Sequence, residues 1–228
     1  MRDKIIVALD FDRFEVAESF VETLKEAVFY KVGLQAFMRY GPRILKLLKD
    51  RKKNVFLDLK FKDIPNTVFW AVKSSMLFDP RFVSIHLSGG KEMMKKAVLA
   101  AQDSADTKIL GVSVLTSFLN EDLIETGVNL NTEDAVIKLC RLGIESGLDS
   151  FVCSPLEIKP LKEKLGSNIT LVTPGIRPHW AAKGDQKRVF TPRMAIEAGA
   201  DYLVIGRPIT ASKDPNGAFT VILNEITG

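Results

Sequence analysis

The chain has 228 residues, of which 46% are apolar and 26% are charged, and its formal net charge is +4. This composition is typical of a soluble globular domain, because a disordered chain would have fewer apolar residues and a higher net charge. No apolar run approaches the roughly 18 residues that a membrane-spanning helix needs. The small positive excess is spread along the chain, so neither a nucleic acid nor a membrane is an expected partner.

Short runs rich in apolar and β-branched residues alternate with segments of helical spacing. The expected strands, in chain order, are Ile5–Asp10, Val28–Gly33, Val55–Lys60, Phe82–Leu87, Ile109–Leu115, Ser150–Ser154, Thr170–Ile176 and Tyr202–Gly206. The expected helices between them include Phe14–Ala27, Phe37–Arg51, Pro65–Phe78, Lys91–Ala101, Thr132–Ser146 and Thr191–Ala198. The last of these begins with Thr191 as an expected cap and Pro192 at its first helical position.

Eight strands separated by amphipathic helices predict an α/β fold, a single (β/α)8 TIM barrel over residues 1–228. In such a barrel the active site lies at the C-terminal ends of the strands. An open, doubly wound sheet is the competing fold. It would more commonly have fewer strands and a glycine-rich turn after the first strand, whereas Asp10, Phe11 and Asp12 stand at that point here.

The cysteines indicate a reducing compartment. Cys140 and Cys153 have no CxxC spacing, and no secretory apolar segment follows Met1. We therefore expect free thiols and a cytoplasmic protein.

Charged residues gather at the ends of the second and third expected strands. Because side chains alternate along a strand, Asp58 and Lys60 share one face, with Phe56 below them. Lys31 has the position on the neighbouring strand to join them, and Asp63 follows in the turn before the next helix. A single Asp–Lys pair could simply be a buried ion pair that closes the barrel. Four such charges carry a desolvation cost of several kcal/mol per ion, so a catalytic role is the preferred interpretation.

A second polar group lies near the end of the chain. Loops after the seventh and eighth strands of such barrels frequently hold a phosphate, through backbone N–H groups and a bidentate arginine. Gly175 and Gly206 would allow close approach of the backbone. The expected side-chain donors are Arg177, Gln186 and Arg207. The long polar segment 177–188 is interpreted as a loop that closes over the phosphate.

With these residues in view, the whole chain resembles the orotidine 5′-monophosphate decarboxylase family. The element Asp-x-Lys-x-x-Asp-Ile-Pro-Asn-Thr, at residues 58–67, is the most specific part of the resemblance. The matching motifs are VALD (Val7–Asp10), YKVG (Tyr30–Gly33), LDLKFKDIPNT (Leu57–Thr67), IHLSGG (Ile85–Gly90), VLTS (Val114–Ser117), TPGIRP (Thr173–Pro178), DQKRVFTP (Asp185–Pro192) and IGRPIT (Ile205–Thr210).

The resemblance implies a role for each polar residue at the site. It implies that Lys31, Asp58, Lys60 and Asp63 are the catalytic charges. Asp63 and Thr67 would reach the neighbouring subunit's site, which implies a homodimer. It also implies that Asp10 holds the ribose, that Thr116 bonds the pyrimidine edge, that Pro174 lines the base pocket, and that Arg177, Gln186 and Arg207 hold the phosphate.

The chemistry implied is the conversion of orotidine 5′-monophosphate to uridine 5′-monophosphate and CO2, with Lys60 stabilising a carbanion at C6 and then protonating it. No metal or organic cofactor is expected, because neither His86 nor His179 stands in a metal-binding spacing. Two alternatives stay open. One is a related magnesium-dependent sugar-phosphate decarboxylase or aldolase, and the other is a catalytically silent barrel that binds pyrimidine nucleotides.

Overall fold

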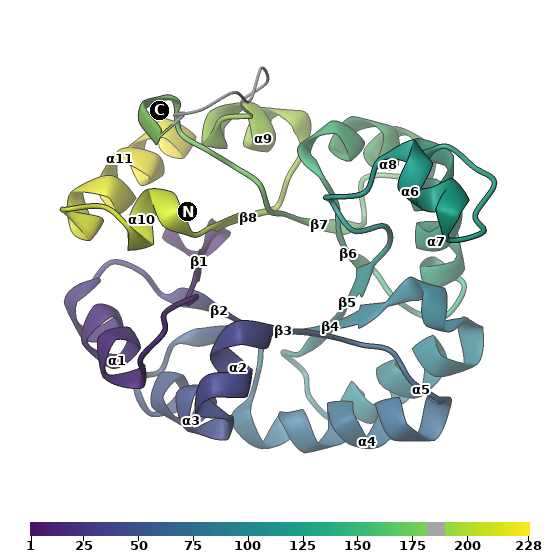
Figure 1. Ribbon diagram of the computed structural model, residues 1–228, viewed down its shortest axis with the longest axis horizontal. Coiled ribbons are helices and arrows are strands. Elements are labelled where there is room, and N and C mark those ends of the chain that lie inside the picture. The colour runs from purple at the N-terminus through teal and green to yellow at the C-terminus, as the bar shows by residue number, and fades with distance from the viewer. Residues whose placement is uncertain (182–189) are drawn as a thin grey trace.

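The computed structural model describes residues 1–181 and 190–228. Its centre is a closed barrel of eight parallel strands that neighbour one another in sequence order (Figure 1). The strands are β1 (Ile5–Ala8), β2 (Phe29–Gly33), β3 (Asn54–Phe61), β4 (Phe82–His86), β5 (Lys108–Val112), β6 (Ser150–Val152), β7 (Thr170–Thr173) and β8 (Tyr202–Ile205). The predicted (β/α)8 barrel is confirmed, and the open sheet is excluded because β1 pairs with β8, for instance at Ile5 and Leu203.

Helices surround the ring of strands on its outer side (Figure 1). They are α1 (Phe14–Thr23), α2 (Leu34–Tyr40), α3 (Pro42–Asp50), α4 (Pro65–Ser75), α5 (Lys91–Ala101), α6 (Asn120–Glu125), α7 (Thr132–Ile144), α8 (Ile158–Leu165), α9 (Pro192–Ala198), α10 (Arg207–Thr210) and α11 (Pro215–Thr227). Their inner faces bury apolar residues against the outside of the barrel. This arrangement explains why the strands are apolar on both faces.

Two local features of the helices bear on the predictions. Thr191 caps α9, since its hydroxyl accepts a hydrogen bond of 3.2 Å from the Met194 N–H, as predicted. The single helix expected over Phe37–Arg51 is wrong, because Gly41 has φ +57° and ψ −148° and divides the segment into α2 and α3. A glycine there leaves the helical region without steric cost, and Pro42 then begins the next helix.

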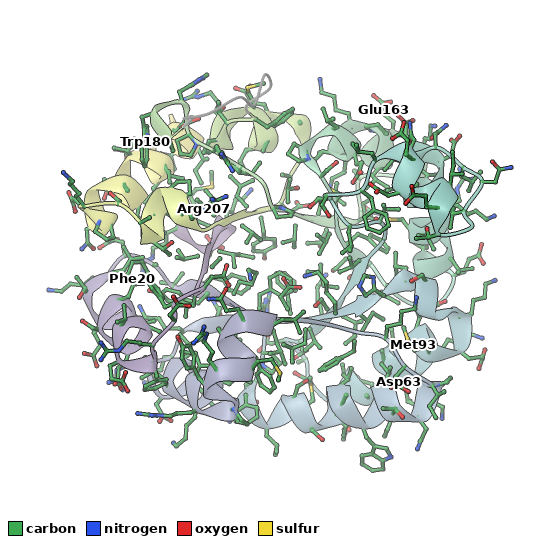
Figure 2. The ribbon with its side chains drawn as sticks, viewed as in Figure 1. Phe20, Asp63, Met93, Glu163, Trp180 and Arg207 are labelled. Atoms are coloured by element: carbon green, nitrogen blue, oxygen red, sulfur yellow. The ribbon has the colours of Figure 1, made fainter. Side chains whose placement is uncertain are left out.

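The lower part of the barrel interior is aromatic. The rings of Phe29 and Phe82 stack with their centroids 5.5 Å apart. Tyr202 meets Phe82 edge to face at 5.1 Å, and Phe56 does so at 6.1 Å. Figure 2 shows that side chains fill the ring that looks open in the ribbon alone. The residues at the C-terminal ends of the strands therefore lie on a packed apolar layer.

Most strands end earlier than predicted. The strand β1 ends at Ala8, so Asp10 lies beyond it, and β5 and β7 end at Val112 and Thr173. Among the described residues, no helix has both the length and the apolar character needed to cross a membrane.

Candidate active site

A cluster of alternating charges lies at the C-terminal ends of β2 and β3. The Lys60 ammonium donates a hydrogen bond of 2.8 Å to Oδ1 of Asp58. The Lys31 ammonium lies 3.9 Å from the other oxygen of that carboxylate and 3.5 Å from Oδ1 of Asp10. Asp58 is only 8% exposed, so its charge is nearly removed from water and is balanced by the two lysines. The structure thus brings together Lys31, Asp58, Lys60 and Asp10.

The strand β3 is irregular where it carries these charges. Four residue steps separate Leu57 from Phe61, but only two separate their partners Val83 and Ile85 on β4. Lys60 lies within this bulge and has φ +52°, a left-handed conformation that is unfavourable for a residue with a Cβ. The alternation of side chains between the two faces of a regular strand therefore does not hold at Lys60.

Ser84 on β4 lies beside the bulge and is fully buried. Its hydroxyl oxygen accepts a hydrogen bond of 2.9 Å from the backbone N–H of Lys60. The same hydroxyl donates to Oδ1 of Asp58 at 3.0 Å. Sequence reasoning missed this residue. Its alternation with Phe82 and His86 on β4 is a signal that could have placed it in the barrel interior.

Three members of the charged cluster, Lys31, Asp58 and Lys60, line a cavity of about 180 Å³. Apolar side chains from β3, β5, β6 and β8 form the rest of its wall, together with the residues that follow β5 and β7. The lining residues are Lys31, Phe56, Asp58, Lys60, Val112, Val114, Leu115, Thr116, Val152, Pro174 and Val204. Thr116 and Pro174 are thus brought to the same cavity as the charges. Apolar walls weaken dielectric screening, so charges here act more strongly than in water.

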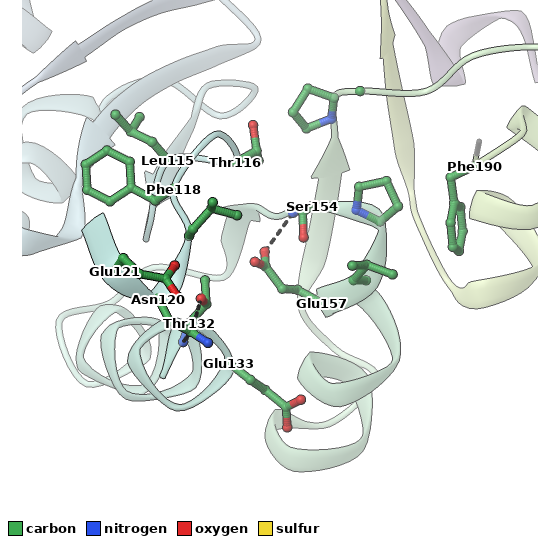
Figure 3. Close-up of a pocket in the computed structure, with 15 residues that line it drawn as sticks. Leu115, Thr116, Phe118, Asn120, Glu121, Thr132, Glu133, Ser154, Glu157 and Phe190 are labelled. Atoms are coloured by element: carbon green, nitrogen blue, oxygen red, sulfur yellow. Dashed lines mark hydrogen bonds between the residues drawn. The ribbon is translucent and has the colours of Figure 1, made fainter. Parts of the chain in front are cut away.

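A larger hollow of about 630 Å³ adjoins this cavity and shares Leu115, Thr116 and Pro174 with it (Figure 3). It contains none of the clustered charges, which line the smaller cavity. At its side, Oε2 of Glu157 accepts a hydrogen bond of 2.7 Å from the Ser154 N–H. Burial raises the pKa of Glu157 above its usual value.

Those expected phosphate residues that the structure describes lie around the ends of β7 and β8. Gly206 precedes α10, and Arg207 is the first residue of that helix. Figure 2 shows Arg207 beside β8 and α10. Arg177 is half-buried, and its backbone N–H donates to the Phe190 carbonyl at 3.1 Å. Gln186 and most of the 177–188 loop lie outside the described residues.

Asp63 and Thr67 are not part of this cluster. Both are exposed, and neither lines the cavity. The label of Asp63 in Figure 2 lies outside the ring of strands. An Oδ1 atom of Asp63 accepts a hydrogen bond of 2.6 Å from the Ile64 N–H, which holds the carboxylate at the start of α4.

His86 ends β4 on the same side of the strand as Ser84. Burial lowers the pKa of His86 below its ordinary value of 6.5, and the nearby positive charges of Lys62 and Lys60 add to this effect. The neutral imidazole is therefore the favoured form beside the lysines at neutral pH. Within residues 1–181 and 190–228, no group of three or more His, Cys, Asp or Glu side chains is arranged to hold a metal ion.

Comparison with known families adds to this geometry. A model of the Orotidine 5′-phosphate decarboxylase / HUMPS family matches residues 3–221. The chain belongs to this family. The resemblance seen in the motifs is thereby confirmed over nearly the whole length.

Curated relatives of similar length agree with the family assignment. An orotidine 5′-phosphate decarboxylase of Nostoc sp. is 43% identical, over 99% of this chain and 98% of the relative. One from Staphylococcus haemolyticus is 44% identical over 97% of both chains. One from Actinobacillus succinogenes is 46% identical over 94% of both. These relatives confirm the expectation of a carboxy-lyase of this family.

Solved structures agree as well. The crystal structure of orotidine 5′-phosphate decarboxylase from Lactobacillus acidophilus is 35% identical, with a TM-score of 0.87, and the match covers 99% of this chain and all of that one. An uncharacterized conserved protein from Geobacillus kaustophilus is 33% identical, with a TM-score of 0.85 over 98% of this chain.

Proposed function

We propose that this chain converts orotidine 5′-monophosphate to uridine 5′-monophosphate and CO2, a step in pyrimidine nucleotide biosynthesis. The observation that carries the proposal is the Lys31–Asp58–Lys60 array at the cavity wall, in which one carboxylate lies between two ammonium groups. The names of the curated relatives support the same substrate.

The reaction breaks the bond between C6 of the pyrimidine and its carboxylate, and the electron pair stays on C6 while CO2 leaves. The ring offers no conventional sink for this pair, so the protein must stabilise it electrostatically. The ammonium of Lys60, whose side chain lines the cavity and is 28% exposed, is the group that does so. It then gives a proton to C6, which forms the new C–H bond, and it regains a proton from solvent.

Asp58 orients the reacting ammonium. Its Oδ1 holds the Lys60 ammonium at 2.8 Å, while Oδ2 faces Lys31 at 3.9 Å. A fixed ammonium costs no reorganisation when charge develops on the substrate. Repulsion between Asp58 and the substrate carboxylate is a secondary contribution in this scheme.

In this scheme Arg177 and Arg207, which follow β7 and β8, hold the phosphate together with Gln186, and Gly206 allows close approach of the backbone. Arg207 follows β8, and Val204 of that strand lines the cavity, which supports a phosphate position within reach of the same substrate. Asp10, 3.5 Å from Lys31, is then the ligand for the ribose hydroxyls. Thr116 and Pro174 contact the pyrimidine. Binding energy from the phosphate can thereby order the reacting groups.

The proposal includes a homodimer in which Asp63 and Thr67 complete the partner's site. The exposed position of Asp63 supports this, and so do two large exposed apolar side chains that follow it in the chain, Ile64 at 67% and Trp70, in α4, at 58% exposure. Subunit mixing tests it. Lys60→Ala and Asp63→Ala proteins, each nearly inactive alone, should recover activity when mixed, because one site of each heterodimer then has both residues. No recovery with exchanged subunits would place Asp63 in its own subunit's site.

The cytoplasm is the proposed location. Cys140 and Cys153 are both free and buried, and burial raises the pKa of the Cys153 thiol to about 12. Such thiols are inert and are compatible with a reducing compartment.

The activity is tested by following the ultraviolet absorbance of orotidine 5′-monophosphate with the purified protein and EDTA. Turnover should persist in EDTA, whereas a magnesium-dependent sugar-phosphate lyase would lose its metal. Lys60→Ala should lower turnover on the order of 10³-fold, and Lys62→Ala, an exposed lysine two residues away, should leave it unchanged. Binding of uridine 5′-monophosphate without turnover would favour the silent barrel.

A further inference from the structure

We propose that Ser84 is a positioning residue that sets the place of the Lys60 ammonium; this inference rests on the proposed function. Ser84 is the middle interior residue of β4, above Phe82 and below His86. Its side chain is fully buried, and it does not line the cavity. Ser84 therefore acts on the reaction through its neighbours.

The backbone of Lys60 needs such support. Lys60 is the only non-glycine residue within a strand of the described chain that has a positive φ, since Lys52 and Asp79 lie outside the strands. The bulge in β3 takes the Lys60 N–H out of the regular pairing with β4. The Ser84 hydroxyl accepts that N–H at 2.9 Å, so a side chain replaces the missing backbone partner.

The same hydroxyl fixes the carboxylate. Its proton goes to Oδ1 of Asp58 at 3.0 Å, and the Lys60 ammonium donates to this oxygen at 2.8 Å. The result is a closed path from the Lys60 backbone, through Ser84 and Asp58, back to the end of the Lys60 side chain. A serine can fill both roles because its hydroxyl donates once and accepts as well. The path fixes both ends of Lys60 relative to the cavity.

The hydroxyl carries no charge, and Ser84 does not line the cavity, so loss of the hydroxyl should affect the alignment of Lys60 more than the binding of the nucleotide. Removal leaves the Lys60 N–H and an Asp58 lone pair without their partner in a buried place. We expect turnover to fall about 10- to 100-fold, while the affinity for uridine 5′-monophosphate changes less than about threefold.

The matched pair Ser84→Thr and Ser84→Val tests the inference, because the two side chains have nearly the same shape and differ in the hydroxyl. Ser84→Thr should keep most of the wild-type turnover, whereas Ser84→Val should show the expected fall of about 10- to 100-fold. Melting temperatures and uridine 5′-monophosphate affinities measured on both variants separate alignment from folding. Equal turnover in the two variants, or a loss of turnover matched by an equal loss of nucleotide affinity, would overturn the inference.

If the added methyl group prevents folding in both, Ser84→Ala and Ser84→Cys replace the pair. The thiol is a weak donor and acceptor, so turnover should follow the order serine, cysteine, alanine. A cysteine variant no better than alanine would contradict the role. A crystal structure of the least active folded variant should show Lys60 outside the left-handed region or its ammonium displaced from Asp58. An unchanged Lys60 would refute the inference.

Failure of the proposed function gives a different result. In that case the wild-type protein itself does not turn over orotidine 5′-monophosphate, and the crystallographic comparison of Lys60 still tests the support by Ser84.

Discussion

The ammonium nitrogen of Lys60 donates a 2.8 Å hydrogen bond to Oδ1 of Asp58, two residues earlier on the same strand. Asp58→Asn would keep the shape of the site and remove the negative charge between the two lysines. We expect turnover to fall roughly 10²- to 10⁴-fold, because an uncompensated buried charge costs about 3–5 kcal/mol. The steady-state rate checks this. Asp103→Asn is the control. It removes one partner of an exposed ion pair with Lys73 and should leave turnover nearly unchanged.

Gly33 sets the position of the Lys31 ammonium by leaving space for it. A Cβ at Gly33 would lie 2.6 Å from Nζ of Lys31, so Gly33→Ala should displace that group without removing its charge. We expect a folded protein with turnover reduced about tenfold. A double-mutant cycle is the measurement, and Gly33→Ala should have little further effect when Lys31 is already Met. Additive losses would show that Gly33 acts by another route.

Arg207 should matter only for substrates that carry a phosphate. Arg207→Ala removes a proposed charge-assisted contact, and we expect the catalytic efficiency on orotidine 5′-monophosphate to fall about 10- to 100-fold. With orotidine, which lacks the phosphate, wild-type and variant proteins should be equally slow. An equal fold-loss on both substrates would show that Arg207 acts on the reacting groups or on folding.

His86 should make the protein less stable in mild acid. Burial lowers its pKa in the folded state below 6.5, whereas the unfolded chain binds the proton near 6.5. Its contribution is therefore fully present above pH 6.5 and is lost as the pH falls towards the folded pKa. Urea midpoints between pH 8 and pH 5 measure this.

The matched comparison is His86→Gln. It is needed because burial raises the pKa of Glu157, so the contribution of Glu157 to stability changes with pH in the opposite direction to that of His86. The difference between wild type and His86→Gln isolates His86. We expect the variant's stability to depend less steeply on pH, and parallel curves would contradict the assignment.

The barrel was predictable from the sequence because each strand is a short apolar run and each crossover has helical spacing. Thr191 and Pro192 likewise mark the start of α9. The division at Gly41 was not predicted, since residues 37–51 keep a helical apolar pattern on both sides of the glycine. The backbone conformation of Gly41 alone divides the segment into two helices.

The charged cluster was predictable in its members more than in its geometry. Lys31 and Asp58 follow from strand alternation. Lys60 reaches the site through a bulge and a left-handed backbone, which a period of two residues cannot anticipate. Ser84 was not predicted because a serine within a strand is uncharged and gives no signal of a catalytic role. Its role depends on the position of the Lys60 N–H, which the bulge sets.

The pairing of β1 with β8 has a consequence for synthesis of the chain. Because Ile5 and Leu203 are neighbours in the closed sheet, β1 keeps an unpaired edge until nearly nine-tenths of the residues have left the ribosome. The nascent polypeptide therefore carries an exposed, apolar template for wrong partners during most of translation. A chaperone that shields the first strand would be of most use during that interval.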